Sequence, residues 1–384
     1  MIRLLVIFLA TTNVFMLLYA PQPLLPLFAE QFGITISTAS LLISVTIMVL
    51  ALSSFLLAPW FDRWKRKQVI LISSALLVFP SLLLAVSDSF PLVLFWRAVY
   101  GLFIPGVTAV IIAYSSEEFP ASKRGRVLGI YVSANVMGGS LGRVIAGPIA
   151  EAFSWHAVFI VVAAFSALVC LLVWWFLPSS RNQTAKDVQG FAVHFRNKAM
   201  LGTFFIGFSQ FFAFIGFFTY LPFYAAKAPF HLSVTQISLL YGTYLFGVFS
   251  APLAGYFSDR IGRRRAMAIG HLIGATGILI TLLPSLTSLI IGASLLALGN
   301  FASQSATTAY VTDIAASSRG AASSLYLVFF YVGGSLGAYI PGLLWNRLAW
   351  NGLVSVTVFT IVLALVSNYA LAGKTPTHRR SSIV

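Results

Sequence analysis

The sequence repeats itself at a distance of about half its length. Residues 124–155 align without a gap with residues 319–350, an offset of 195, and eleven of these positions are identical. Five of the eleven are consecutive, Gly-Gly-Ser-Leu-Gly at 138–142 and again at 333–337, and an Asp-Arg pair at 62–63 recurs at 259–260. A parallel repeat of this kind predicts one helical bundle built twice, with a binding site where the two copies meet.

The composition places this repeat in a membrane. Hydrophobic residues make up 59% of the 384 and charged residues only 9%, more apolar surface than a water-soluble core could use. A spanning helix needs about 20 apolar residues. Runs of that kind occur at 4–28, 37–60, 69–87, 91–115, 126–151, 155–177, 199–225, 233–256, 266–285, 287–312, 320–345 and 350–372. The expected fold is all-α and integral to the membrane, with 12 transmembrane helices in two pseudo-symmetric six-helix bundles.

One long polar stretch separates the two halves. We expect an N-terminal bundle at 1–178, a cytoplasmic linker at 179–198 with a short helix near 191–197, and a C-terminal bundle at 199–384. Placing both termini in the cytoplasm puts 20 of the 24 Lys and Arg residues on the inner side, as the positive-inside rule requires. The net charge of +15 is thus a topology signal, and a nucleic-acid partner is not needed to explain it.

Two equivalent loops carry a charged motif. The loop after the eighth run contains Gly255, Asp259, Arg260, Gly262 and Arg263. A glycine four residues before the aspartate permits close helix packing, and the basic residues anchor the loop inside. The loop after the second run keeps Asp62 and Arg63 but has Ala58 and Lys65 in place of the two glycines. A topology role alone would suit the basic residues, but it explains the repeated Asp-Arg pair poorly.

With twelve helices in a 6+6 repeat, these loops resemble those of the major facilitator superfamily over the whole chain. In that family the motif locks the two bundles in one state of an alternating-access cycle. The resemblance therefore implies a gating role shared by Asp62, Arg63, Asp259 and Arg260, although the missing glycines leave open which loop carries the gate.

The fourth and fifth helices can be compared with motifs of one group within this superfamily, the drug/proton antiporters. Arg97, Tyr100 and Gly101 are similar to an arginine-plus-glycine motif of drug/proton antiporters, whereas the fifth helix keeps only Gly147-Pro148 of the antiporter motif and has Arg143 where glycine is usual. Three short segments are also similar to bacterial efflux permeases for sugars such as arabinose: Ser-Glu-Glu at 116–118, Gly-Gly-Ser-Leu-Gly-Arg at 138–143 and Ser-Ser-Leu-Tyr at 323–326.

Arg97 and Arg143 are ionisable residues inside the membrane, where charge is costly and usually functional. Both lie ~10–14 Å below the outer surface at 1.5 Å per helical residue, and neither recurs in the other half. We expect them to attract an anionic or hydroxyl-rich substrate, because arginine makes forked contacts to carboxylate and phosphate. The alternative is that they bond backbone carbonyls, or that Arg143 pairs with Glu151.

Polar residues on the helices that line the cavity in this family would complete the site, and Asn135 shares a face with Arg143 at i and i+8. The predicted substrate-binding set is Arg97, Arg143, Tyr100, Asn135, Asn13, Gln22, Gln210, Asn300 and Gln304. No Asp or Glu falls in the membrane interior, which makes a dedicated exporter of organic cations a poor fit. Of the phenylalanines at 211, 212, 214, 217 and 218, two are expected in the cavity.

The predicted function is secondary active export of small amphipathic or anionic organic compounds across the plasma (bacterial inner) membrane by a monomer. No cofactor or metal is expected; a proton gradient would drive transport, with His271, Glu30, Glu151 or the substrate itself as proton carrier. An importer or facilitator of sugars or organic acids would share every feature cited. A non-transporting sensor is a more distant alternative, and an enzyme is not expected because five scattered His and one Cys supply no catalytic cluster.

Overall fold

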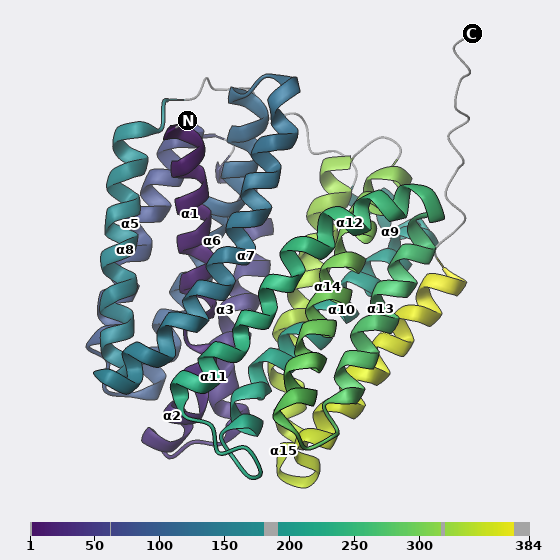
Figure 1. Cartoon of the computed structure of the whole chain (residues 1–384). Helices are drawn as coiled ribbons and strands as arrows, with labels where there is room; N and C mark the ends of the chain where they lie inside the picture. Colours follow the sequence, from purple (N-terminus) through teal and green to yellow (C-terminus); the bar gives the residue numbers. More distant parts are fainter. Residues whose placement is uncertain (1, 62, 180–190, 316–318, 372–384) are drawn as a thin grey trace.

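A computed structural model describes residues 2–61, 63–179, 191–315 and 319–371. Helices account for nearly all of this part of the chain, and no strand occurs in it (Figure 1). Eight of these helices are long and apolar enough to cross a membrane. The all-α membrane fold is therefore confirmed.

The first half contains six passes. Its elements are α1 (Ile2–Tyr19), η1 (Gln22–Leu24), α2 (Leu25–Gln31), α3 (Ile36–Leu56), α4 (Ala58–Phe61), α5 (Arg66–Ala85), α6 (Phe90–Glu118), α7 (Ala121–Ala152) and α8 (Trp155–Phe176). The first pass runs from α1 through η1 to α2, because Pro21 and Pro23 interrupt the α-helical hydrogen bonds. The short 3₁₀ turn at this break presents Gln22 in the interior.

The second half contains the other six passes. Its elements are α9 (Phe191–Arg196), α10 (Lys198–Ala225), α11 (Val234–Leu240), η2 (Tyr241–Leu245), α12 (Phe246–Ile261), α13 (Arg263–Ile280), α14 (Leu286–Ile314) and α15 (Arg319–Ala370). The eighth pass combines α11, η2 and α12. The last two passes are one continuous assignment in α15, bent at Ala349 where φ is +45°. The short helix expected near 191–197 is present as α9, and most of the predicted linker lies outside the described residues.

The repeated Gly-Gly-Ser-Leu-Gly segment holds the same helix pair together in each bundle. A β-carbon at Gly142 would lie 2.7 Å from the Met16 carbonyl oxygen, so α7 and α1 touch through their backbones. A β-carbon at Gly337 would lie even closer to the Phe212 carbonyl oxygen, so α15 and α10 touch in the same way. Small residues at such crossings are how helices pack closely in lipid.

The two bundles are joined away from the ends where the termini emerge (Figure 1). Ser335 of α15 donates to the Ser44 carbonyl of α3 at 2.8 Å, and Tyr220 of α10 donates to Ser40 of α3 at 3.2 Å. Glu151 at the end of α7 accepts from the Thr235 amide at the start of α11 at 2.8 Å. Towards the other end the ribbons of the two bundles diverge (Figure 1).

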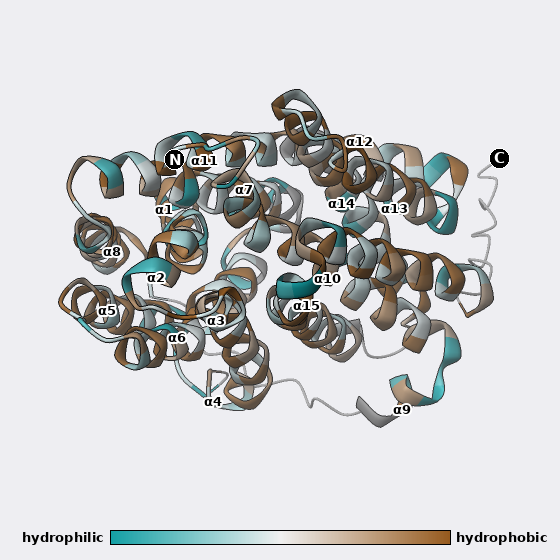
Figure 2. Ribbon diagram, turned by 90° about the horizontal axis from the view of Figure 1, so that it is seen from below, coloured by the Kyte–Doolittle hydropathy of each residue, from teal (hydrophilic) through white to brown (hydrophobic). Residues whose placement is uncertain are grey.

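The lipid-facing surface is apolar. Side chains such as Phe79, Trp175 and Phe359 are more than half exposed, and Figure 2 shows hydrophobic residues along most of the helical surface. In a bilayer every backbone polar group must be satisfied within the helices, which leaves such side chains free to meet lipid.

Candidate functional site

Arg143 lies at the junction of the two bundles and is completely buried. Its Nε donates to Gln22 Oε1 at 2.6 Å, and its Nη1 donates to the Gly139 carbonyl at 2.7 Å. The Gln22 amide in turn donates to Thr219 Oγ1 of α10 at 2.9 Å. A chain of hydrogen bonds therefore runs from α7 through the break in the first pass to the C-terminal bundle.

Three tyrosine rings enclose the Arg143 guanidinium. Its Cζ lies 4.0 Å from the ring centroid of Tyr19, 4.8 Å from that of Tyr244 and 5.2 Å from that of Tyr241. Tyr19 ends α1, and the other two come from the 3₁₀ segment η2, whose i and i+3 positions eclipse one another. Cation–π contacts of this kind are worth about 2 kcal/mol when desolvated.

The guanidinium still has an unused donor. Arg143 Nη2 is buried and makes no hydrogen bond of good geometry among the described residues, and the Tyr244 hydroxyl lies beside the guanidinium. The acidic residues that the structure describes are all exposed or half-buried, and none is hydrogen-bonded to Arg143: Glu30, Asp88, Glu117, Glu118, Glu151, Asp259 and Asp313. The alternative pairing with Glu151 is not made, because that carboxylate accepts from Ser233 and Thr235. A buried cation without a counter-ion is costly, and an anionic guest would relieve that cost.

Arg97 lies in a different setting, entirely within the N-terminal bundle. Its three nitrogens donate to the carbonyls of Leu17, Leu18 and Leu42 at 2.7, 2.7 and 3.0 Å. Tyr100, one turn later, donates to Ser81 at 2.6 Å. This placement favours the structural alternative for Arg97, since its guanidinium ties α6 to α1 and α3.

The remaining predicted site residues divide between the bundles. Asn13 accepts from Ser166 in the N-terminal bundle at 2.9 Å, and Asn135 is half-buried two turns before Arg143. Gln210 donates to the Asn300 carbonyl at 2.6 Å in the C-terminal bundle, and Gln304, one turn further along α14, is half-buried. The structure thus joins Gln22 to Arg143 and Gln210 to Asn300, in two separate clusters.

Aromatic residues of α10 surround the tyrosines. The ring centroids of Phe214 and Phe218 lie 5.2 and 5.8 Å from that of Tyr244. Two others pack on rings outside this cluster: Phe211 stacks on Phe330 at 4.0 Å, and Phe217 packs on Trp350 at 5.3 Å. Two of the five phenylalanines that the sequence singled out therefore border the Arg143 cluster.

Sequence reasoning missed Thr219, Tyr241 and Tyr244. The Tyr-Gly-Thr-Tyr segment at 241–244 is an available signal, because glycine and threonine favour a local break in an apolar run. Nothing in the sequence links Thr219 to Gln22, which lies 197 residues earlier.

The charged loops contain ion pairs within each bundle. Arg263 pairs with Asp259 at 2.5 Å and with Asp313 at 3.1 Å, and Arg66 pairs with Glu117 at 3.1 Å in the equivalent place of the first half. Arg63 and Arg260 are exposed, and Asp62 lies outside the described residues. The gating role predicted for these residues stays a prediction.

Of the two motif glycines in the second loop, the structure requires Gly262 but not Gly255. Gly262 has φ +92°, a conformation that favours glycine, whereas Lys65 at the equivalent position has φ −61°. The first loop therefore needs no glycine there. A β-carbon at Gly255 would lie 3.6 Å from Ser305 Oγ, an ordinary contact, so in this conformation close packing does not require that glycine.

Comparison with known proteins identifies the class. The family model of the Major Facilitator Superfamily matches residues 5–229 and 225–383. The chain belongs to this superfamily of membrane transporters, as the loop motifs and the repeat indicated.

Individual relatives and solved structures are similar over almost the whole chain. Inner membrane transport protein YnfM of Escherichia coli (strain K12) is 32% identical over 94% of this chain and 88% of its own. An uncharacterized transporter of Buchnera aphidicola subsp. Schizaphis graminum is 32% identical over 95% and 90%. The crystal structure of a bacterial homolog of the human lysosomal transporter Spinster, inward-facing and unoccupied, matches with a TM-score of 0.79 at 18% identity and covers 95% of both chains.

Proposed function

We propose that this transporter exports small amphipathic or anionic organic compounds across the bacterial inner membrane by alternating access, driven by proton exchange. The observation that carries the proposal is Arg143, a buried guanidinium with a free Nη2 and three tyrosine rings around it. Guanidinium recognises carboxylate through paired donors, and the rings offer an apolar surface to the rest of such a compound.

The position of Arg143 would couple binding of the anionic substrate to the alternating-access cycle. Its partner Gln22 also holds Thr219 of the opposite bundle. An anion that takes up Arg143 donors competes for the contact that joins the bundles, so binding would alter the balance between the two access states. With both termini in the cytoplasm, the bundles are closed on the outer side, and the Arg143 cluster would be approached from inside the cell, which suits loading for export.

Import of sugars or organic acids remains the second candidate, because the same cluster would accept such a compound from outside after the bundles rock. The two functions differ in the direction of net flux under an imposed proton gradient.

The test is thermal stabilisation of the purified monomer by aromatic carboxylates, sugars and quaternary ammonium ions. At a ligand concentration a hundredfold above Kd, binding adds about 2.7 kcal/mol of stability. We expect carboxylates to stabilise the parent protein and Arg126→Ala, an exposed arginine on the same helix, but not Arg143→Gln. Stabilisation by quaternary ammonium ions that survives in Arg143→Gln would overturn the anion assignment. Flux of the stabilising carboxylate in proteoliposomes, with the pH gradient imposed in either direction, separates export from import.

A further inference from the structure

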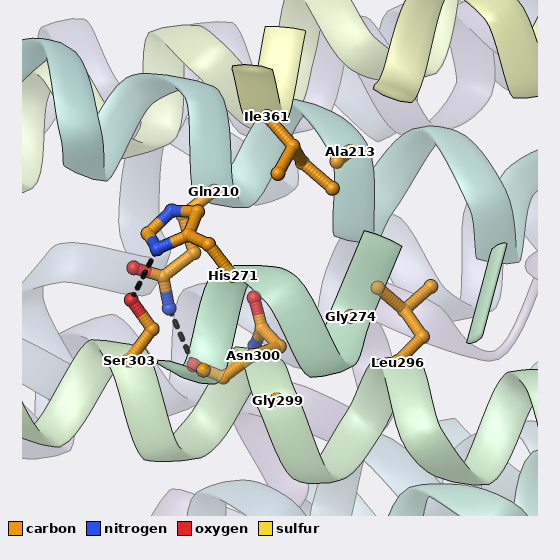
Figure 3. A pocket seen from close by; sticks show the side chains of 10 residues that line it. Gln210, Ala213, His271, Gly274, Leu296, Gly299, Asn300, Ser303 and Ile361 are labelled. Carbon is orange, nitrogen blue, oxygen red and sulfur yellow. Dashed lines mark hydrogen bonds between the residues drawn. The ribbon is translucent and has the colours of Figure 1, made fainter. Parts of the chain in front are cut away.

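The C-terminal bundle contains a second polar cluster that the Arg143 site does not use. A small cavity lies between α10, α13, α14 and α15, and it leaves about 10 Å³ for the centre of a water molecule. His271 of α13, Gln210 of α10, and Asn300 and Ser303 of α14 line it together with apolar residues and glycines (Figure 3). That space is near the minimum for one water.

The hydrogen bonds of His271 define which nitrogen is free. Its Nδ1 lies 2.8 Å from the Met267 carbonyl and 2.9 Å from Ser303 Oγ. A carbonyl oxygen only accepts, so Nδ1 carries the hydrogen and Nε2 of the neutral ring holds a lone pair. Nε2 is buried and has no hydrogen-bond partner in the described part of the chain.

The two amides add further acceptors. Gln210 Nε2 donates to the Asn300 carbonyl at 2.6 Å, which fixes Gln210 Oε1 as the free end of that amide. Gln210 Oε1 and Asn300 Oδ1 are both buried and have no partner among the described residues. Three unused acceptors therefore line one cavity.

No charged residue balances this cluster. The ten lining residues come from all four helices and include no Asp, Glu, Lys or Arg, and His271 is the one group among them that titrates near neutral pH. None of the charged residues of α10, α13, α14 and α15 lines the cavity, and the nearest of them along its own helix is Arg265, six residues before His271: Lys198, Arg263, Arg264, Arg265, Asp313, Arg319 and Arg347. A set of unused acceptors without a charged residue fits a guest that brings a hydrogen-bond donor or a proton.

We propose that His271 is a reversible proton-binding site, in which Nε2 takes up the proton that drives transport and the amide oxygens of Gln210 and Asn300 accept from the imidazolium, directly or through one water. The step is the transfer of H⁺ from hydronium to the Nε2 lone pair, with water released. This inference rests on the proposed proton coupling and names the residue that the coupling lacks.

The cluster occurs in one half only. The positions 195–197 residues before His271 are Ser74, Ala75 and Leu76, just as Arg143 has no arginine counterpart at Ala338. Packing residues such as the repeated glycines recur in both halves. Because each residue occurs in one half only, we infer that the N-terminal bundle binds the anion through Arg143 and that the C-terminal bundle binds the proton through His271.

The test is ¹⁵N NMR of histidine-labelled protein in proteoliposomes between pH 5 and pH 8.5, without sodium and with choline as the salt cation. The signal absent in His271→Gln identifies the residue. His156→Gln is the matched control, because His156 Nδ1 also lies at a backbone carbonyl, that of Ala85 at 2.9 Å. We expect His271 to change from neutral to protonated within this range, and Gln210→Leu and Asn300→Leu each to lower the midpoint of that change by about one pH unit, which is a tenfold drop in the ratio of protonated to neutral His271 at a given pH.

A His271 ring that stays neutral at pH 5 in the parent protein would overturn the proposal. So would a signal that responds to sodium and not to pH, which would make the cavity a sodium site. Because the NMR measurement uses no organic ligand, its outcome is independent of the Arg143 experiment. Transport driven by a pH gradient with a neutral His271 would leave the proposed function standing and remove only this inference.

Discussion

Gly147 and Gly342 occupy equivalent positions in the two halves, and each lies against a helix of the opposite bundle. A β-carbon at Gly147 would lie 2.5 Å from the Val234 carbonyl of α11, and one at Gly342 would lie 2.9 Å from Ser37 Cα of α3. The repeat therefore supplies the same close contact twice, once on each side of the closed end.

Replacing either glycine with alanine is expected to open that end. The new methyl group overlaps backbone atoms as well as a hydroxyl, that of Ser238 at Gly147 and that of Tyr220 at Gly342, so moving a side chain is not enough and the helices must separate. Spin labels at Phe153 and Lys227, both exposed, should report longer distances in Gly147→Ala and Gly342→Ala. Gly129→Ala on the same helix is the control, because nothing lies within 4 Å of its β-carbon position. Unchanged distances in both glycine variants would mean that these contacts do not limit opening.

Thr219→Val should weaken the closed state without unfolding either bundle. The change removes the acceptor of the Gln22 amide across the interface, a loss of about 1 kcal/mol, which changes the ratio of the two states about fivefold. Thr357→Val is a matched buried control, because Thr357 bonds only carbonyls of its own helix. The same pair of spin labels reads the population. An equal change of the spin-label distances in both threonine variants would mean that loss of any buried threonine hydroxyl loosens the protein, and would contradict a specific role for the Gln22–Thr219 hydrogen bond.

Glu151→Gln is expected to shift the same population in the same direction. The carboxylate accepts from Ser233 Oγ at 3.0 Å and from the Thr235 amide at 2.8 Å, and an amide oxygen is a weaker acceptor. Glu30→Gln, exposed and in the first half, is the comparison. Because these hydrogen bonds lie between the bundles and not inside either one, we expect Glu151→Gln to change the distances between the bundles and to leave the melting temperature nearly unchanged. A large drop in melting temperature would contradict that prediction.

Arg97→Leu should destabilise the N-terminal bundle and leave ligand selectivity intact. The substitution leaves three buried carbonyls without a donor, and each unsatisfied group costs about 1–3 kcal/mol. Thermal unfolding with and without the stabilising carboxylate measures both effects. If Arg97→Leu abolishes carboxylate stabilisation while Arg143→Gln keeps it, the roles assigned to the two arginines must be exchanged.

The fold could be predicted from the sequence because its determinants are local or repeated. Apolar runs of spanning length predict the transmembrane helices, and the repeated Gly-Gly-Ser-Leu-Gly segment predicts where neighbouring helices touch. The loop glycines were harder, because only backbone angles distinguish a glycine that is needed, Gly262, from one that a side chain could replace, Gly255.

The candidate site was predicted in part. The sequence singled out Arg97 and Arg143 on equal grounds, since both are charges at similar depth in the membrane. Their surroundings differ because the Arg97 guanidinium meets three carbonyls and one tyrosine ring, whereas the Arg143 guanidinium meets one carbonyl, one amide and three tyrosine rings.

The sequence by itself determined that this chain is a twofold helical bundle in a membrane, because hydrophobicity, charge asymmetry and repetition are properties of the chain alone. Only the tertiary structure decided what each buried polar group faces. Gln22 and Thr219, or His271 and Ser303, become partners through helix packing between distant segments, and a hydrogen bond depends on distance and direction that no sequence pattern specifies.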